Sequence, residues 1–496
     1  MFSKLRSMIR EVLHKVIPYK DIAQVEHIAS PLSTEMVNAL DSWYLLYLNR
    51  PDWLAPGRVK SLHLPSFISS ELARQVTLEM KWNITGTDGN GGTQDDNGNY
   101  IMNPRAQYLK DEFRKLMDNL RPKLEQGFAA GGMAIRPYPK DGHIYFDFTM
   151  DWSLYPVAFG DSGELIDVIF RDSYTEGRTY YTRLERHKLV GSNVEITQRV
   201  FKSASREHIG TETSLTEVEP WANLAPQATV TAADGNMFGW FRTAAANNID
   251  VDCPMGASIY ANAIDAIREA DMQWSRFLWE YEGSELAIDV DPLVLRPKKD
   301  GTGMESPKLN ERLFRGVDLG SDESYHVFSP SIRDAAQING MNQIFMRIED
   351  LVGFARGTIS DANVEAKTAT ELKINKQRSY ATISDNQKAL ERCLREVIRI
   401  MDKFATIYHL APEGDYEASF DWDDSIITDT DTQMQVRLQL ISEGIISKAE
   451  FREWYFGETK AQAQAAIDAI HDENAQGIES LLPKVPEDSP PDQQDQ

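Results

Sequence analysis

The longest regular pattern of hydrophobic positions in the chain runs from Ala366 to Tyr408. This stretch contains neither glycine nor proline, and most of its residues favour a helix. Its apolar residues recur three or four positions apart, or at multiples of a heptad, and so form one stripe: Ala369, Leu372, Ile383, Leu390, Leu394, Val397, Met401, Phe404 and Tyr408. The pattern predicts a single helix roughly 60 Å long, at ~1.5 Å per residue. A helix of that length is expected to be an axis on which other parts are built.

Two shorter amphipathic helices are expected upstream of the long one. The first spans residues 258–283, with Ser258 as its N-cap. The second spans residues 330–353, and Ser329 followed by Pro330 is its start signal. Each helix has an apolar stripe that must be covered by a partner.

Two connecting segments separate these three helices. Residues 289–328 hold short apolar bursts among proline, glycine and lysine, which indicates a small strand-bearing insert. Residues 355–367 form a flexible loop before the long helix; taken alone, such a loop is an ordinary helix–helix connection. The whole series favours an elongated, directional part of a protein rather than a catalytic pocket.

The remaining segments give a mixed α+β pattern. Residues 31 to about 124 have helical spacing, and residues 131 to about 241 alternate apolar and polar positions between DG, DSG and EG turns, which predicts an antiparallel meander. The first 17 residues form an amphipathic helix without the features of a signal peptide. The last 21 residues, an acidic and proline-rich tail, have too little apolar content to fold.

Composition narrows the class of protein. The 496 residues carry a formal net charge of −24, which argues against a general nucleic-acid binder, because such proteins normally carry a basic patch. Two cysteines are too few for a disulfide framework or a thiolate metal site and fit a reducing cytoplasm. No apolar run approaches the ~20 residues of a membrane-spanning helix. We expect no cofactor and no membrane partner.

An acidic cluster offers the main enzymatic alternative. Asp421, Asp423 and Asp424 could bind Mg²⁺ for phosphodiester hydrolysis, since two-metal sites need clustered carboxylates. A solvated acidic loop is the simpler interpretation, because no partner lysine or histidine is placed nearby. The chain also has no GxxxxGK[ST] loop and no GxSxG elbow, so it is not expected to hydrolyse ATP or to be a serine hydrolase.

Histidine and glutamate on the predicted strands raise the question of a metal site. His143, Glu185 and His187 lie in the meander, but no HExxH motif or matched ligand cluster surrounds them. Isolated residues of this kind on strands are more often solvent-facing partners of other side chains. We therefore expect no metal and no catalytic residue.

Four passages give the chain a resemblance to a known family. They are GGMAIRPYPKDGHIYFDFTMDWSLYPVAF, YYTRLERHKL, CPMGASIYANAIDAIREADMQWSRFLWEYEGSE, and ARGTISD followed by KTATELKINKQRSYATISDNQKALE. In order and spacing they resemble the portal proteins of tailed bacteriophages, in particular the Gram-positive siphophage group labelled minor capsid or A118-like portal proteins. The resemblance implies a ring of identical subunits, typically twelve, at one capsid vertex, through which double-stranded DNA is packaged and ejected.

The resemblance also implies an order of parts along the chain. These parts are a wing (1–255), a first stem helix (256–286), a clip (287–328), a second stem helix (329–354), a tunnel loop (355–367), a long core helix returning to the wing (368–410), a helical crown (411–475) and an acidic disordered tail (476–496).

Functional residues follow from the same resemblance. The tunnel loop would place these residues at the DNA channel: Arg356, Asp361, Asn363, Glu365 and Lys367. The clip would offer these cations to partner proteins: Arg296, Lys298, Lys299, Lys308, Arg312 and Arg315. The stem helices would pack through Trp274, Phe277, Ile344 and Ile348.

The expected partners are those of a portal in a virion. They are the terminase large subunit, a head-completion adaptor, the major capsid and scaffolding proteins, and double-stranded DNA that passes without sequence specificity, after assembly in the host cytoplasm. An acidic subunit suits this role, because DNA carries one negative charge per ~1.7 Å and a strongly cationic bore would hold it. The alternatives are another virion structural protein, such as an adaptor or a scaffold, and the nuclease considered above.

Overall fold

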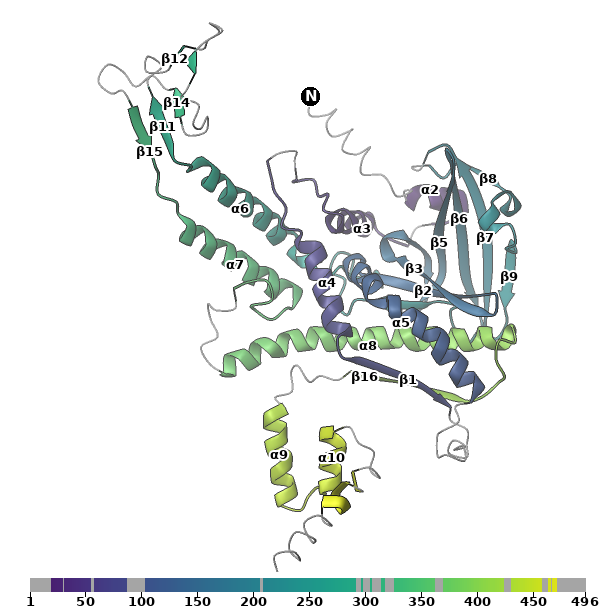
Figure 1. The fold of residues 1–496 in the computed structure, drawn as a ribbon. Coiled ribbons are helices and arrows are strands. Elements are labelled where there is room, and N and C mark those ends of the chain that lie inside the picture. The colour runs from purple at the N-terminus through teal and green to yellow at the C-terminus, as the bar shows by residue number, and fades with distance from the viewer. Residues whose placement is uncertain are drawn as a thin grey trace, which may run out of the picture. The chain divides into compact units, whose positions relative to one another are not determined.

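The computed structural model describes residues 19–29, 31–54, 58–86, 103–205, 208–290, 296–297, 304–305, 314–316, 325–361, 369–422, 430–456, 463–464 and 466–470. The chain divides into two compact units, Met1–Asp423 and Asp424–Gln496. Figure 1 shows the elements of both. The expected N-terminal helix and acidic tail lie outside the described residues.

Helices and strands are mixed along the first unit, which confirms the α+β class. Its helices are α2 (Tyr19–Glu26), α3 (Thr34–Tyr47), α4 (Leu64–Thr77), α5 (Pro104–Ala130), α6 (Ile264–Gly283), α7 (Asp334–Val352) and α8 (Ala369–Ile407). Its strands are β1 (Met80–Gly86), β2 (Gly132–Lys140), β3 (His143–Met150), β4 (Leu154–Phe159), β5 (Leu165–Glu176), β6 (Thr179–Val190), β7 (Asn193–Ser203), β8 (Thr211–Thr213), β9 (Gln227–Val230), β10 (Gly239–Arg242), β11 (Ala287–Val290), β12 (Arg296–Pro297), β13 (Met304–Glu305), β14 (Phe314–Gly316), β15 (Tyr325–Phe328) and β16 (Tyr416–Trp422).

The expected meander is confirmed as two antiparallel sheets. One has the order β10-β2-β3, and the other has the order β4-β5-β6-β7-β8 with β9 also paired to β7. Tight turns join β5 to β6 and β6 to β7, and each turn contains a glycine with positive φ, Gly177 and Gly191. Gly177 lies at the predicted EG turn, and Gly142, also with positive φ, lies at the predicted DG turn between β2 and β3, so both turn predictions are confirmed.

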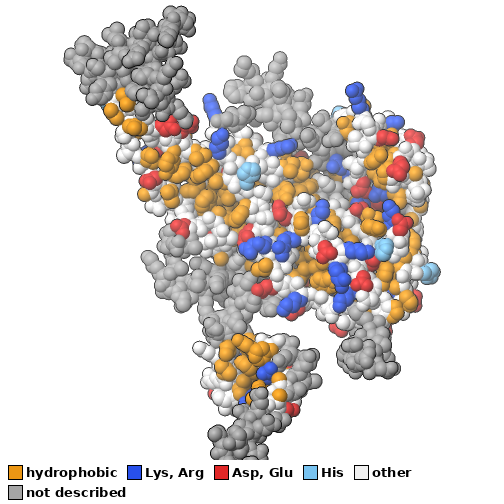
Figure 2. Space-filling view, viewed as in Figure 1, with side chains coloured by type: hydrophobic (Ala, Val, Ile, Leu, Met, Phe, Trp, Pro, Cys, Tyr) orange, Lys and Arg blue, Asp and Glu red, His pale blue; other side chains and the backbone are white. Residues whose placement is uncertain are grey.

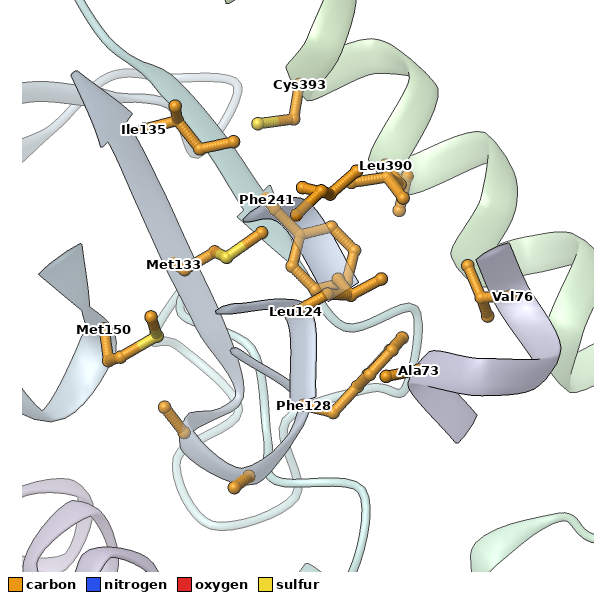
Figure 3. Packing of buried hydrophobic residues seen from close by; sticks show 14 of the residues in the cluster. Ala73, Val76, Leu124, Phe128, Met133, Ile135, Met150, Phe241, Leu390 and Cys393 are labelled. Carbon is orange, nitrogen blue, oxygen red and sulfur yellow. The ribbon is translucent and has the colours of Figure 1, made fainter. Parts of the chain in front are cut away.

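The main hydrophobic core lies between helices and the β10-β2-β3 sheet. Figure 3 shows side chains from α4, α5, β2, β3, β10 and α8 pointing toward one another. The rings of Phe128 and Phe241 meet edge to face, with centroids 5.5 Å apart, and both are fully buried. The backbone of β10 approaches α8 closely at Gly239, where an added Cβ would lie 2.7 Å from the carbonyl oxygen of Cys393. Glycine is needed there because no larger residue fits.

The long helix α8 confirms the strongest sequence prediction. Its stripe residues Leu390, Leu394 and Val397 are all fully buried. Its C-terminal end is held by Arg105 of α5, a buried residue whose guanidinium donates to the carbonyl oxygens of Pro412 and Asp402, at 3.0 and 3.2 Å. Arg105 therefore ties the start of α5 to the end of α8.

An ionic cluster joins the two sheets. Arg136 of β2, 3% exposed, donates to Glu185 of β6 at 3.0 Å and to Asp172 of β5 at 3.1 Å. His187 lies 2.8 Å from the same Glu185 carboxylate and is buried, which differs from the solvent-facing position expected for it. Burial is the largest single influence and would raise the pKa of Glu185, but Arg136, His187 and Arg183 together outweigh it and hold that pKa well below its ordinary value. The third residue considered for a metal, His143, is exposed and lies 2.9 Å from Glu112.

The structure differs from the sequence prediction in one pairing. The helical spacing expected from residue 31 to about 124 is interrupted by β1, which pairs with β16 far along the chain in antiparallel register. Residues 416–422 therefore belong to the first unit, whereas the family resemblance predicts one helical part over residues 411–475. Local periodicity could not find this pair, because each strand has only its distant partner to define it.

The second unit holds α9 (Thr430–Ser442) and α10 (Lys448–Phe456). Gly444, with a φ of +75°, separates the two helices. Ser447 and Glu450 form a capping box at the start of α10, in which the Glu450 amide donates to the Ser447 hydroxyl at 3.1 Å and the Ser447 amide donates to the Glu450 carboxylate at 2.7 Å. The helical segment expected here is thus two helices.

Candidate functional site

The candidate site is the series from α6 to α8 that the sequence indicated as a directional part. Helix α6 begins at Ile264, preceded by a 3-10 turn at Ala261–Ala263, so Ser258 is not its N-cap. Helix α7 begins at Asp334, four residues after Pro330. Both helices begin later than predicted because the residues before them make tertiary contacts in place of the first turn; for example, the amide of Ile259 donates to the carbonyl of Phe128 in α5.

Polar bonds fix α6 and α7 as an antiparallel hairpin. The Arg333 guanidinium donates to the Glu280 carboxylate at 3.0 Å, and this bond, with those from the Arg333 amide and Gln337, lowers the pKa of Glu280 to about 2. The Gln337 amide donates to the same carboxylate at 2.8 Å and also pairs with Gln273. These contacts set the relative height of the two helices.

The predicted stem residues occupy different environments in this hairpin. Trp274 and Phe277 stack, with ring centroids 5.5 Å apart, and both are partly exposed. Ile348 is fully buried and belongs to the main core, against which the half-buried Ile344 also packs. The hairpin is therefore anchored to the core at the C-terminal end of α7, while the aromatic pair faces a pocket.

A strand-bearing insert joins the two helices, as predicted. Its sheet has the order β14-β11-β15, and β12 pairs with β13. Of the predicted partner-binding cations, Arg296 lies on β12 opposite Glu305, and Arg315 lies on β14 opposite Asp289. The others, Lys298, Lys299, Lys308 and Arg312, lie outside the described residues.

The segment after α7 is held in place by a buried carboxylate. The Glu349 side chain is fully buried, and it accepts hydrogen bonds from the amide of Ser360 at 2.8 Å, from the hydroxyl of Ser360 at 2.7 Å and from the amide of Ile359. The Asn342 side chain accepts from the amide of Asp361 at 2.8 Å. Residues 355–361 therefore form a fixed turn, which corrects the expectation of a flexible loop over this part.

Two of the predicted channel residues, Arg356 and Asp361, lie in this turn. Arg356 lies 3.2 Å from the Asp350 carboxylate, and its side chain is 44% exposed. Asp361 is exposed at the end of the turn, and Asn363, Glu365 and Lys367 lie outside the described residues.

Glu349 and Asn342 are site residues that sequence reasoning missed. A signal was available, because Glu349 is an acidic residue four positions after Phe345, within the apolar stripe of its helix. A charge on such a stripe must be buried with partners, and here the partners are backbone amides that follow in the chain.

The structure does not bring the carboxylates considered for a nuclease together in a metal site within the described residues. Asp421 is exposed on β16, in register with Lys81 of β1. Asp423 and Asp424 lie outside the described residues. Within the described ranges, no group of three or more histidine, cysteine, aspartate or glutamate side chains is arranged to hold a metal ion. No helix in the described part of the chain is long and apolar enough to cross a membrane.

These features define a protein organised around a long helix, α8, and a helical hairpin, α6–α7. A family model for phage portal proteins, described as SPP1 Gp6-like, matches residues 92–479. The chain belongs to this family of phage portal proteins, which is a structural and not an enzymatic family. No curated protein matches the chain in a sequence comparison.

Proposed function

We propose that the chain is the subunit of a homo-oligomeric ring, typically of twelve copies, at one capsid vertex. The ring forms the channel through which double-stranded DNA enters the capsid and later leaves it. Family membership supports this role, and the observation that carries it is the order α6, strand-bearing insert, α7, fixed turn and α8. A hairpin that projects from a core-anchored base, followed by a 39-residue helix, suits a part that lines or surrounds an axis.

The elements receive roles under this proposal. The wing is built from α3, α4, α5 and the two meander sheets; α6 and α7 are the stem, and β11 to β15 make the clip. Helix α8 is the long core helix, and α9 and α10 are the crown. The tunnel loop is residues 355–367, and its first part, 355–361, is the turn that Glu349 holds next to α7.

Partner contacts are assigned to the clip and to the end of the stem next to it. The clip cations, Arg296 and Arg315 among them, would face the terminase large subunit during packaging and a head-completion adaptor afterwards. The capsid and scaffolding proteins would contact the wing. The whole assembles in the host cytoplasm and ends in the virion at the neck between head and tail.

The first test is the mass and shape of the purified full-length protein. Mass photometry and negative-stain microscopy are expected to find closed annular particles. A small oligomer with metal-dependent DNA cleavage would favour the nuclease instead. A single subunit that binds only to a pre-formed ring would favour an adaptor.

The second test addresses the channel residues. Replacing both Arg356 and Lys367 with alanine is expected to reduce the fraction of capsids that retain DNA several-fold, because brief phosphate contacts are lost, and the difference from wild type should shrink at high salt. The control is Arg74→Ala, since Arg74 is also an exposed arginine paired with a nearby carboxylate, Glu71. Equal DNA retention in wild type and the double variant would remove these residues from the channel.

A further inference from the structure

One side of the α6–α7 hairpin carries a pocket. Its volume is about 360 Å³, within the ~300–1,000 Å³ range of pockets that hold organic groups. Apolar side chains supply most of the lining: Trp274, Phe277, Ile338, Met341, Phe345 and Ile359. Asp361 and Asn342 add polar groups to it. Figure 2 shows hydrophobic side chains gathered over this hairpin.

The opposite side of the hairpin carries an exposed tryptophan. Trp279 is 70% exposed, although indole rings are among the costliest side chains to leave in water. At ~3.6 residues per turn, Trp279 lies about 160° around α6 from Phe277, which lines the pocket. A projecting apolar group and an apolar pocket thus occupy two different faces of one rigid element.

Trp279 and the pocket lie at about the same position along the axis of the hairpin, which is called their height below. Gln337 of α7 pairs with both Gln273 and Glu280 of α6, so its height is between theirs. Ile338, in the pocket, is the next residue. The Trp279 backbone is about one turn further along α6, but helical side chains lean toward the N-terminus of their own helix, and on two antiparallel helices this lean brings the Trp279 indole and the Ile338 side chain toward the same level. The indole is therefore expected level with Ile338.

Charges near the two features are also complementary. Arg276 is exposed one turn before Trp279, on nearly the same face of α6. Asp361 lines the pocket beside Asn342, whose side chain holds its amide, and Asn342 lies one turn beyond Ile338 in the same direction along the hairpin. A tryptophan in the pocket would bring this arginine toward this aspartate.

We propose that Trp279 of each copy inserts into the α6–α7 pocket of the next copy, with Arg276 facing Asp361 of that copy. This proposal rests on the proposed ring and identifies a contact between neighbouring copies in it. The two faces differ, so the contact is head to tail, and rotation about an axis along the hairpin keeps their heights matched. Such a contact repeats from copy to copy until the ring closes.

The decisive experiment is a disulfide between copies of the full-length protein. Trp279→Cys combined with Ile338→Cys is expected to give a ladder of covalent multimers on a non-reducing denaturing gel after oxidation. Each single variant should run as a monomer. The native Cys253 and Cys393 are both buried, so they leave the introduced thiols as the reactive pair.

The possible outcomes distinguish a failure of the proposed contact from a failure of the proposed ring. Annular particles with no ladder from the double variant would overturn the contact and leave the proposed function standing. A protein that forms no ring under any condition would overturn the proposed function itself. A ladder confined to the double variant supports both.

Further substitutions test the chemistry of the contact. Trp279→Ala is expected to raise the concentration for half-assembly by about 30-fold or more, the effect of losing an aromatic anchor at an interface. Tyr408→Ala, at an exposed aromatic outside the hairpin, should leave it unchanged. Arg276→Asp and Asp361→Arg should each weaken assembly, and together they should restore it; failure of the pair to restore assembly would overturn the charge match.

Discussion

Helices α8 and α6 are both amphipathic, yet their apolar side chains meet different surroundings. On α8, Leu390 and Leu394 are fully buried in the main hydrophobic core. On α6, Trp279 is 70% exposed and Leu278 is 37% exposed. The apolar stripe of α8 is therefore covered by other parts of the same subunit, whereas apolar side chains of α6 remain exposed to solvent.

The difference follows from the number of elements around each helix. Helix α8 packs against strands β2 and β10 and against helices α4 and α5, which together cover its stripe. The hairpin beyond its anchored base consists of two helices, and two helices can cover only the sides that face each other. The second unit resembles the hairpin in this respect, because among its described residues only Ala449 and Ala463 are buried hydrophobics.

The largest expected effect on stability is at α8, the helix whose apolar side chains are buried. Leu394→Ala should lower the free energy of unfolding by about 2 to 5 kcal/mol, because a fully buried leucine is lost and a cavity remains in a core with four neighbouring elements. Urea unfolding followed by circular dichroism measures it. The matched control is Trp279→Ala, which removes a larger but exposed side chain and should change the unfolding of a dissociated subunit by less than about 0.5 kcal/mol. A large loss of unfolding free energy for Trp279→Ala in the dissociated subunit would contradict this difference between α8 and α6.

A smaller, pH-dependent effect is expected from Asp151, a buried carboxyl beside the β10-β2-β3 sheet that is only partly hydrogen-bonded within the described residues. Asp151 is fully buried; one of its oxygens accepts from the Trp240 indole at 3.2 Å, and the other has no hydrogen-bond partner within the described residues. Burial raises the pKa of Asp151 to about 7, against the smaller opposing influence of Trp240 and Arg242.

The sign of the pH effect follows from this shift. Because the folded pKa lies above the unfolded one, the folded state holds the extra proton between about pH 4 and pH 7, and the stability it contributes is lost as the pH rises through that window. Relative to Asp151→Asn, wild-type stability should fall by on the order of 2 to 4 kcal/mol from pH 4 to pH 8. Asp161→Asn, in an exposed turn, is the control and should track wild type. A wild-type curve parallel to that of Asp151→Asn would contradict the prediction.

Regular periodicity allowed most helices and the meander to be predicted from sequence. The predicted span 366–408 differs from α8 by only a few residues at its start. The predictions failed where a segment depends on distant residues. Strand β1 exists through its pairing with β16, and the late start of α6 reflects contacts with α5. The fixed turn after α7 depends on Glu349, a residue ten positions before the amide it binds.

The sequence by itself determined which faces of each helix and strand must leave water, because side-chain spacing sets that face whatever lies opposite. It also determined the order of helix, insert, helix, loop and long helix. Only the tertiary structure decided which of those faces the subunit covers and which it leaves exposed, because burial depends on how many elements surround a segment. It also decided the partners of Arg136, Asp151 and Glu349, since a buried charge is stabilised by groups that only folding brings within hydrogen-bond distance.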